Sequence, residues 1–178
     1  IFTSDNGGER FSDTWPLVGG KMDLTEGGIR VPYIAQWAGK LPEGEVCTQH
    51  CMTMDWTATF LDIAGVAPHP DYPLDGVSML PVLRRPDQVF SRPMYWRMNY
   101  RSQQAVRVGD WKYLEVDGNR YLLDLSVDER ERANLAQREP ARLAAMQAQA
   151  AAWADTFGPI PADARSELVY TEKDMPAR

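Results

Sequence analysis

A carboxylate and an amide stand side by side near the start of the chain, as Asp5 and Asn6 of the segment IFTSDNGGER. The apolar residues before them are typical of the end of a buried strand, and Gly7 and Gly8 allow a sharp turn after it. Ligands of open α/β sheets bind beyond the carboxyl ends of strands, and hard cations such as Ca²⁺ prefer oxygen ligands. Taken alone, however, these residues are more typical of an ordinary tight turn.

A lysine, Lys21, follows two glycines in the loop WPLVGGKMDLTEGGIRVP. A lysine in such a loop can act as a point charge for a sulfuryl or phosphoryl oxygen, although a single lysine is more often a solvated surface residue. Glu26 and Arg30 of the same loop could pair across the second Gly-Gly turn. We expect that pair to have a structural role.

Two cysteines, Cys47 and Cys51, flank His50 in VCTQHC. Ordinary thiols are the favoured interpretation, and a short-loop disulfide or a metal site with His50 are the alternatives. A zinc site needs four ligands, and the only other histidine is His69. The chain contains no Gly-x-Ser-x-Gly, Walker or Gly-x-Gly-x-x-Gly motif, so neither a serine triad nor nucleotide binding is indicated.

The composition suits one globular domain, or one domain with a small subdomain: 178 residues with 44% hydrophobic side chains. The net charge of −6 argues against nucleic acid or an anionic membrane as a partner. No stretch approaches the roughly 18 apolar residues of a membrane span. The segment carries no export-signal pattern, which says little about the compartment.

The first half of the chain predicts elements of an α/β sheet domain. A strand end at 1–5 is followed by a loop to about 28 and by a largely buried strand at 30–39. A helix is predicted over MDWTATFLDIAGV, with Gly65 as its stop. The predicted inner face of that helix is Trp56, Thr59, Phe60, Ile63 and Ala64. A short helical turn in VSMLPVLRR would have Ser78 as a cap and Pro81 in its first turn.

The second half predicts a small α+β subdomain. Three or four antiparallel strands, rich in aromatic and β-branched residues, are divided by turn signals at 109–110 and 117–119. A long helix follows in PARLAAMQAQAAAWADTFG, and the tail from Ile160 is expected to be extended. The predicted inner face of that helix is Leu143, Met146, Ala150, Trp153 and Phe157. We expect the division to fall at 1–90 and 91–178.

Six segments, in order, resemble the C-terminal half of a type I sulfatase of the alkaline phosphatase superfamily. They are TSDNGG, PLVGGKMDLTEGGIRVPYIAQWAGKLP, MDWTATFLDIAGV, LDGVSMLPVL, QAVRVGDWKYL and YLLDLSVDERERANLA. The resemblance implies that Asp5 and Asn6 bind a divalent metal, usually Ca²⁺ (with Mg²⁺ or Mn²⁺ as alternatives), and that Lys21 binds the substrate sulfate. It also implies a periplasmic or secreted location.

The nucleophile of such sulfatases is a formylglycine made within Cys/Ser-x-Pro-x-Arg, and no such motif is present in this chain. We therefore expect these residues to be the C-terminal part of a longer sulfatase, inactive alone, whose partners are the N-terminal half and a sulfated small molecule or carbohydrate. The alternatives are a phosphate or phosphonate ester hydrolase of the same superfamily and a non-catalytic binding module. By resemblance, Tyr95, Trp96, Arg97 and Tyr100 are candidate substrate contacts, although packing within a sheet is the favoured role for each.

Overall fold

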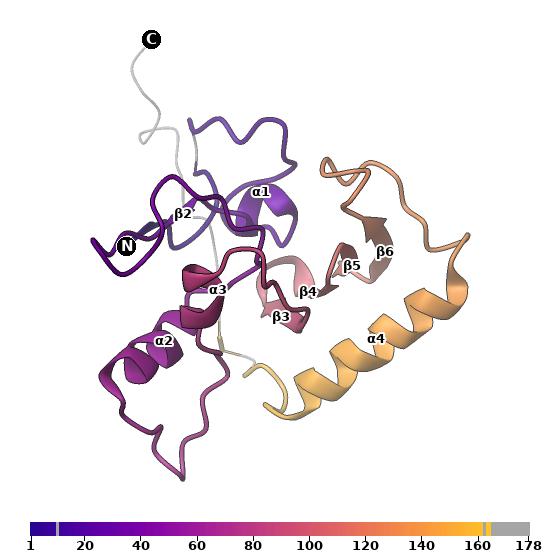
Figure 1. Cartoon of the computed structure of the whole chain (residues 1–178). Helices are drawn as coiled ribbons and strands as arrows, with labels where there is room; N and C mark the ends of the chain where they lie inside the picture. Colours follow the sequence, from indigo (N-terminus) through magenta and orange to yellow (C-terminus); the bar gives the residue numbers. More distant parts are fainter. Residues whose placement is uncertain (10, 162, 165–178) are drawn as a thin grey trace, which may run out of the picture. The chain divides into compact units, whose positions relative to one another are not determined.

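The computed structural model describes residues 1–9, 11–161, 163 and 164, and it divides into two compact units (Figure 1). The first unit comprises Ile1–Asp5 and Val31–Met94. The second comprises Asn6–Arg30 together with the chain from Tyr95 onward. The later cut falls between Met94 and Tyr95, and residues 6–30 group with the C-terminal sheet.

The first unit contains a minimal sheet of two strands, β1 (Phe2–Thr3) and β2 (Tyr33–Ile34). They pair antiparallel, with Phe2 opposite Ile34. The strand expected over 30–39 is therefore much shorter, and Ile34 is 60% exposed, so the expectation of a largely buried strand is wrong for the described structure. Within the described residues the only strand that pairs with β2 is β1. Because β1 has two residues, it cannot shield β2 from solvent.

Helix α2 (Asp55–Ala64) confirms the prediction of a helix that ends at Gly65, which adopts the left-handed conformation with φ 65°. Its buried side is narrower than predicted, because Trp56 and Thr59 are buried whereas Phe60 and Ile63 are exposed. The adjoining α3 (Leu80–Arg84) has Pro81 in its first turn, as expected. The backbone N–H of Leu80 donates to Oγ of Ser78 at 3.2 Å.

A buried carboxylate at the start of α2 binds residues from three other segments of the first unit. Asp55 is fully buried; it accepts hydrogen bonds from the backbone N–H of Met52 (2.7 Å) and of Val77 (3.0 Å). Arg92 forms an ion pair with the same carboxylate. A buried charge is tolerated when it is paired and hydrogen-bonded in this way.

The second unit is built on a four-stranded sheet in chain order: β3 (Pro93–Met98), β4 (Gln103–Val108), β5 (Trp111–Val116) and β6 (Asn119–Asp124). The β4–β5 and β5–β6 pairs are antiparallel, which confirms the predicted strands and turns. A short helical turn, η1 (Tyr100–Ser102), links β3 and β4. At the β5–β6 turn Asp117 and Gly118 have φ of 50° and 77°, as a type I′ hairpin requires.

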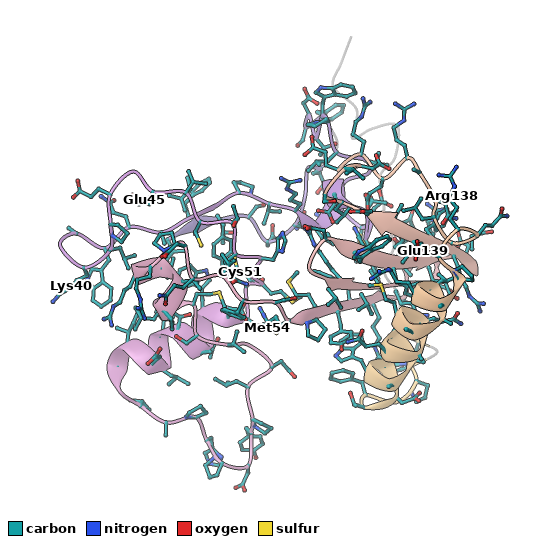
Figure 2. All side chains as sticks on the ribbon, turned by 45° about the vertical axis from the view of Figure 1, so that its right-hand side comes forward. Lys40, Glu45, Cys51, Met54, Arg138 and Glu139 are labelled. Atoms are coloured by element: carbon teal, nitrogen blue, oxygen red, sulfur yellow. The ribbon has the colours of Figure 1, made fainter. Side chains whose placement is uncertain are left out.

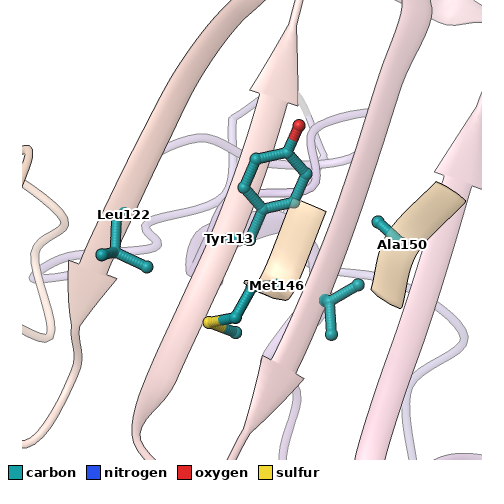
Figure 3. Close-up of a cluster of buried hydrophobic side chains, with 5 residues drawn as sticks. Tyr113, Leu122, Met146 and Ala150 are labelled. Atoms are coloured by element: carbon teal, nitrogen blue, oxygen red, sulfur yellow. The ribbon is translucent and has the colours of Figure 1, made fainter. Parts of the chain in front are cut away.

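The predicted long helix is α4 (Pro140–Asp155), and it packs against β4 and β5. Arg138 and Glu139 immediately precede it (Figure 2). Met146 and Ala150 of α4 are buried against Tyr113 and Leu122 of the sheet (Figure 3). Phe157, predicted to lie on the inner face, is beyond the helix end and 51% exposed. The tail predicted to be extended lies largely outside the described residues.

Candidate functional site

The two predicted metal ligands follow β1 after one intervening residue, Ser4. The side chain of Asp5 is exposed, and that of Asn6 is partly buried. Asp5 ends the first segment of one unit and Asn6 begins the first segment of the other, so a boundary between the units falls between the two oxygen donors.

The segment that starts at Asn6 lies against the loop that carries Lys21. The backbone N–H of Gly7 donates to the carbonyl of Gly28 at 2.8 Å, and the N–H of Lys21 donates to the carbonyl of Gly8 at 2.8 Å. These two bonds bring the predicted sulfate ligand and the predicted metal ligand Asn6 into one local structure, although fourteen positions of chain separate them.

Glycines make this contact possible. A Cβ atom on Gly7 would lie 1.8 Å from the carbonyl oxygen of Gly27, and one on Gly20 would lie 2.5 Å from that of Gly8. A Cβ on Gly28 would meet the carbonyl oxygen of Asp23 at 2.0 Å. Real carbon and oxygen atoms do not approach so closely, so each position excludes any larger residue unless the backbone moves.

The ammonium group of Lys21 forms an ion pair with Glu9, with 2.6 Å between Nζ and Oε2. The two side chains are 38% and 36% exposed, so water and a ligand can reach the pair. Glu9 could not be selected from the sequence, because the backbone contact between the two glycine-rich segments brings Lys21 to it.

A glutamine of β4 holds the other end of the Lys21 loop. The side chain of Gln103 accepts a hydrogen bond from the N–H of Leu24 (3.0 Å) and donates to the carbonyl of Met22 (2.9 Å). Gln103 is buried, and both ends of its amide are thus satisfied by loop backbone. The four-stranded sheet therefore positions the loop directly.

A buried charge cluster anchors the loop where it ends, at the single helical turn α1 (Glu26–Ile29). Glu26 is 1% exposed and binds Nζ of Lys112 at 2.9 Å and Nη1 of Arg107 at 3.0 Å. The expected pairing of Glu26 with Arg30 is therefore wrong, because β4 and β5 present two closer cations, and Arg30 lies 3.4 Å from Glu129. Burial raises the pKa of Glu26, but Lys112 and Arg107 lower it by more, so that pKa stands below its ordinary value.

Glu131 completes this cluster from the loop after β6. One of its oxygens lies 2.7 Å from Nζ of Lys112, and the other accepts a hydrogen bond from the N–H of Glu26 at 2.7 Å. Burial raises the pKa of Glu131 above its ordinary value despite the attraction of Lys112. The carboxylate of Glu26 acts in the same direction, because two like charges share one lysine.

The donor set of Asp5 and Asn6 fits part of a hard-cation site. A carboxylate and an amide supply the oxygen ligands that Ca²⁺ and Mg²⁺ prefer. Among residues 1–9, 11–161, 163 and 164, no group of three or more His, Cys, Asp and Glu side chains could hold a metal ion. The described residues thus offer two consecutive oxygen donors and no complete shell of such ligands.

The cysteines show no disulfide. Cys47 and Cys51 are both free thiols, as the favoured interpretation had it. Burial, reinforced by the nearby carboxylate of Asp55, raises the pKa of the Cys51 thiol to about 11. A thiol of that kind is a weak nucleophile at neutral pH.

The aromatic residues considered as substrate contacts serve the packing of the second unit. Tyr95 stacks on Trp153 with 5.1 Å between ring centroids, and Gln149 donates to its hydroxyl. Arg97 donates to the carbonyl of Gly158 at 2.8 Å. Trp96 packs against the core that contains Leu24, Ala105 and Leu114, and the carbonyl of Tyr100 accepts from Gln103. These contacts favour the packing role.

Comparison with protein families places the chain among the sulfatases. Residues 20–151 match the family described as "N-sulphoglucosamine sulphohydrolase, C-terminal". The chain belongs to this family, because the match covers more than half of it.

Several curated relatives are sulfatases. The chain is 38% identical over 120 residues to N-acetylgalactosamine-6-sulfatase of Canis lupus familiaris, which covers 63% of this chain and 22% of that protein. It is 33% identical over 121 residues to arylsulfatase A of Homo sapiens, covering 63% of this chain and 24% of the relative. The chain thus spans less than a quarter of the length of these relatives.

Solved structures share the fold. The crystal structure of Ps i-CgsB matches with a TM-score of 0.75 and 28% identity, over 85% of this chain and 35% of the other. The same protein in complex with k-i-k-neocarrahexaose gives a TM-score of 0.74. A protein in complex with its substrate D-glucosamine-2-N,6-O-disulfate matches at a TM-score of 0.60 and 20% identity, over 74% of this chain and 29% of the other, which shows the fold alone. The predicted α/β fold class is confirmed, and the neighbours have the alkaline-phosphatase-like fold of sulfatases.

Proposed function

We propose that this chain is the C-terminal part of a sulfatase that hydrolyses sulfate esters of carbohydrates or other small molecules. The family match and the sulfatase relatives support the class of reaction. The observation that carries the proposal is the backbone contact between residues 7–8 and the Lys21 loop, which sets Lys21 beside the segment that begins at Asn6.

In the proposed reaction Lys21 holds the sulfate group of the substrate. Its ammonium group carries three hydrogen-bond donors and a full positive charge. Sulfuryl oxygens gain negative charge as the ester bond breaks, and a fixed cation stabilises that charge. To reach the substrate, Lys21 exchanges its contact with Glu9 for one with the sulfate.

Asp5 and Asn6 would hold a divalent cation, Ca²⁺ or in its place Mg²⁺ or Mn²⁺. When bound, such a cation supplies further positive charge beside the sulfuryl oxygens. The remaining ligands and the formylglycine nucleophile would come from an N-terminal part of the same enzyme, because the chain contains no Cys/Ser-x-Pro-x-Arg motif.

The decisive experiment compares Lys21→Ala with Lys40→Ala in the full-length protein. Lys40 is an exposed lysine of the first unit, so its loss removes the same charge from the surface. Turnover of 4-nitrophenyl sulfate should fall by about 10²–10³ in Lys21→Ala, as for loss of one charge-stabilising donor. Turnover in Lys40→Ala should match the wild type. A wild-type rate in Lys21→Ala would overturn the assignment of Lys21.

A matched pair of aryl esters distinguishes the alternatives. A sulfatase should hydrolyse 4-nitrophenyl sulfate much faster than 4-nitrophenyl phosphate, and the reverse preference would replace the proposal by a phosphate ester hydrolase. Turnover of neither ester, together with an upstream sequence that lacks Cys/Ser-x-Pro-x-Arg, would indicate a non-catalytic binding module.

A further inference from the structure

An exposed tryptophan and an arginine stack on each other within the second unit. The guanidinium carbon of Arg130 lies 4.1 Å from the ring centroid of Trp15. Trp15 is nevertheless 70% exposed, so the described residues leave most of its surface uncovered. A guanidinium stacked on an aromatic ring can still present its edge N–H groups to an anion, because stacking uses its face.

The backbone around Trp15 is held by hydrogen bonds between residues close in sequence. The N–H of Trp15 donates to Oδ1 of Asp13 at 2.9 Å, and the N–H of Leu17 donates to the carbonyl of Thr14 at 2.8 Å. The hydroxyl of Thr14 donates to the carbonyl of Gly19 at 3.0 Å. An exposed aromatic ring on a hydrogen-bonded turn needs little further ordering when a ligand binds.

Arg130 has no carboxylate partner among the described residues, although glutamates flank it on both sides. Glu129 lies 3.4 Å from Arg30, and Glu131 is bound to the buried Lys112. The Nε atom of Arg130 is buried and has no hydrogen-bond acceptor in the described structure. No carboxylate of the described residues thus neutralises its positive charge, and an anionic ligand would have to reach it through the Nη groups because Nε is buried.

Trp15 of the stacked pair begins the loop that carries Lys21. A Cβ on Gly8 would lie 2.5 Å from Cγ2 of Thr14, the residue before Trp15. The carbonyl of the same Gly8 accepts the hydrogen bond from the N–H of Lys21. Trp15 thus directly follows a residue that lies close to Gly8, the same glycine whose carbonyl Lys21 contacts.

We propose that Trp15 and Arg130 form a subsite for a second sulfated sugar unit of the substrate. The free face of Trp15 stacks on the sugar ring, and the edge of Arg130 donates paired hydrogen bonds to a sulfate on that sugar. The inference rests on the proposed function, in which Lys21 binds the sulfate that is removed. It extends that function to sulfated oligosaccharides rather than isolated small esters.

The test separates the subsite from the reaction by using two kinds of substrate and ligand with the full-length protein. Turnover of 4-nitrophenyl sulfate, which has no second sugar unit, should be unchanged in Trp15→Ala and Arg130→Ala. Binding of oligosaccharides is measured by calorimetry. The oligosaccharides come from carrageenan, chondroitin 6-sulfate and heparan sulfate, each in sulfated and desulfated form. The dissociation constant of the tightest sulfated ligand should rise about tenfold in either variant.

Conservative and control variants distinguish the two contacts. Trp15→Phe should retain most of the affinity because a ring remains, whereas Arg130→Gln should lose the preference for the sulfated over the desulfated form. Arg132→Ala and Tyr72→Ala are matched controls, since Arg132 is an exposed arginine of the same loop and Tyr72 is an aromatic residue that is 73% exposed. Both controls should bind as the wild type.

The outcomes separate the two proposals. Failure to hydrolyse any sulfate ester would contradict the proposed function, and the binding measurement would still decide the subsite. Absence of binding by all three sulfated oligosaccharides, or dissociation constants within twofold of the wild type in both alanine variants, would overturn the subsite. Weakened turnover of 4-nitrophenyl sulfate in Trp15→Ala or Arg130→Ala would equally overturn it, because the pair would then support the local structure instead.

Discussion

Lys21 and Glu9 form an ion pair with 2.6 Å between Nζ and Oε2, and each side chain remains more than one third exposed. Pairs of this exposure contribute little to folding, since water screens the charges. Glu9 also competes with any anion for the same ammonium group. The pair therefore affects ligand binding at Lys21 more than stability.

Replacement of Glu9 by Gln should tighten the binding of sulfate. The variant removes the competing charge and leaves a side chain of similar size. Inorganic sulfate should inhibit the full-length enzyme at lower concentration in Glu9→Gln than in the wild type, while the free energy of unfolding changes by less than about 1 kcal/mol. Glu129→Gln breaks the comparably exposed pair with Arg30 and should leave inhibition unchanged. Weaker inhibition in Glu9→Gln would mean that Glu9 positions Lys21.

Gly7→Ala should distort the contact that brings Lys21 beside Asn6. The new methyl group would lie 1.8 Å from the carbonyl oxygen of Gly27, so the two segments must separate. The cost of such overpacking is about 1–3 kcal/mol of unfolding free energy, and aryl sulfate turnover should fall with it. Urea denaturation and turnover of the full-length variant measure both effects.

Gly39→Ala is the control for this effect. Gly39 has φ 67° and nothing within 4 Å of its Cβ position, so the substitution costs about 1–2 kcal/mol through its left-handed backbone alone. In Gly39→Ala the turnover of the aryl sulfate per folded molecule should be unchanged. Normal turnover in Gly7→Ala would show that the glycine contact does not position Lys21.

The parts of the fold that the sequence predicted well depend on local signals. The Asp117-Gly118 turn, the stop of α2 at Gly65 and the period of α4 each follow from neighbouring residues. The predicted length of β2 was wrong, because the extent of a strand depends on the neighbouring strands that pair with it.

The candidate site shows the same division between local and long-range information. Asp5, Asn6 and Lys21 were selected from motifs that stand whole in the sequence. Glu9 and the partners of Glu26 were missed, because contacts such as that with Lys112, 86 residues away, are created by the packing of the loop on the sheet. The charge pattern around a single residue carries no information on such a partner.

Lys112→Met should destabilise the second unit strongly. Lys112 is fully buried and binds both Glu26 and Glu131, so its loss leaves the buried Glu131 without its cation and Glu26 with Arg107 alone. Breaking a buried ion pair from one side costs about 3–5 kcal/mol. Urea denaturation measures the change, and Lys40→Met at an exposed position should stay within about 0.5 kcal/mol of the wild type. A comparably small effect in Lys112→Met would contradict the buried cluster.

The pH dependence of stability should reveal Glu131. Its folded-state pKa lies above the ordinary value of 4.5, so its contribution to stability is fully present below pH 4.5 and is lost as the pH rises through the folded-state pKa. Glu26 has a lowered pKa, and its contribution is present above pH 4.5 and is lost only in more acid solution. Of these two glutamates, Glu131 is therefore the one whose contribution changes between neutral pH and 4.5.

Glu131→Gln isolates this effect, because glutamine resembles the protonated acid at every pH. The wild type should gain stability relative to the variant as the pH falls from neutral toward 4.5, measured by urea denaturation at several pH values. A difference between the wild type and Glu131→Gln that stays constant over this interval would contradict the raised pKa of Glu131.

Removal of Asp5 tests the proposed metal site most directly. Asp5→Ala deletes one of the two consecutive oxygen donors, and the described residues contain no cluster that could replace it. In the full-length protein we expect Ca²⁺ affinity measured by calorimetry to fall at least tenfold and aryl sulfate turnover to be abolished. Asp87→Ala removes an exposed carboxylate from the first unit and should leave both quantities unchanged. Treatment of the wild type with a chelator should reproduce the loss of turnover, and added Ca²⁺, Mg²⁺ or Mn²⁺ should restore it to different extents. If Asp5→Ala binds Ca²⁺ and turns over substrate as the wild type does, Asp5 is part of an ordinary turn and the metal lies elsewhere.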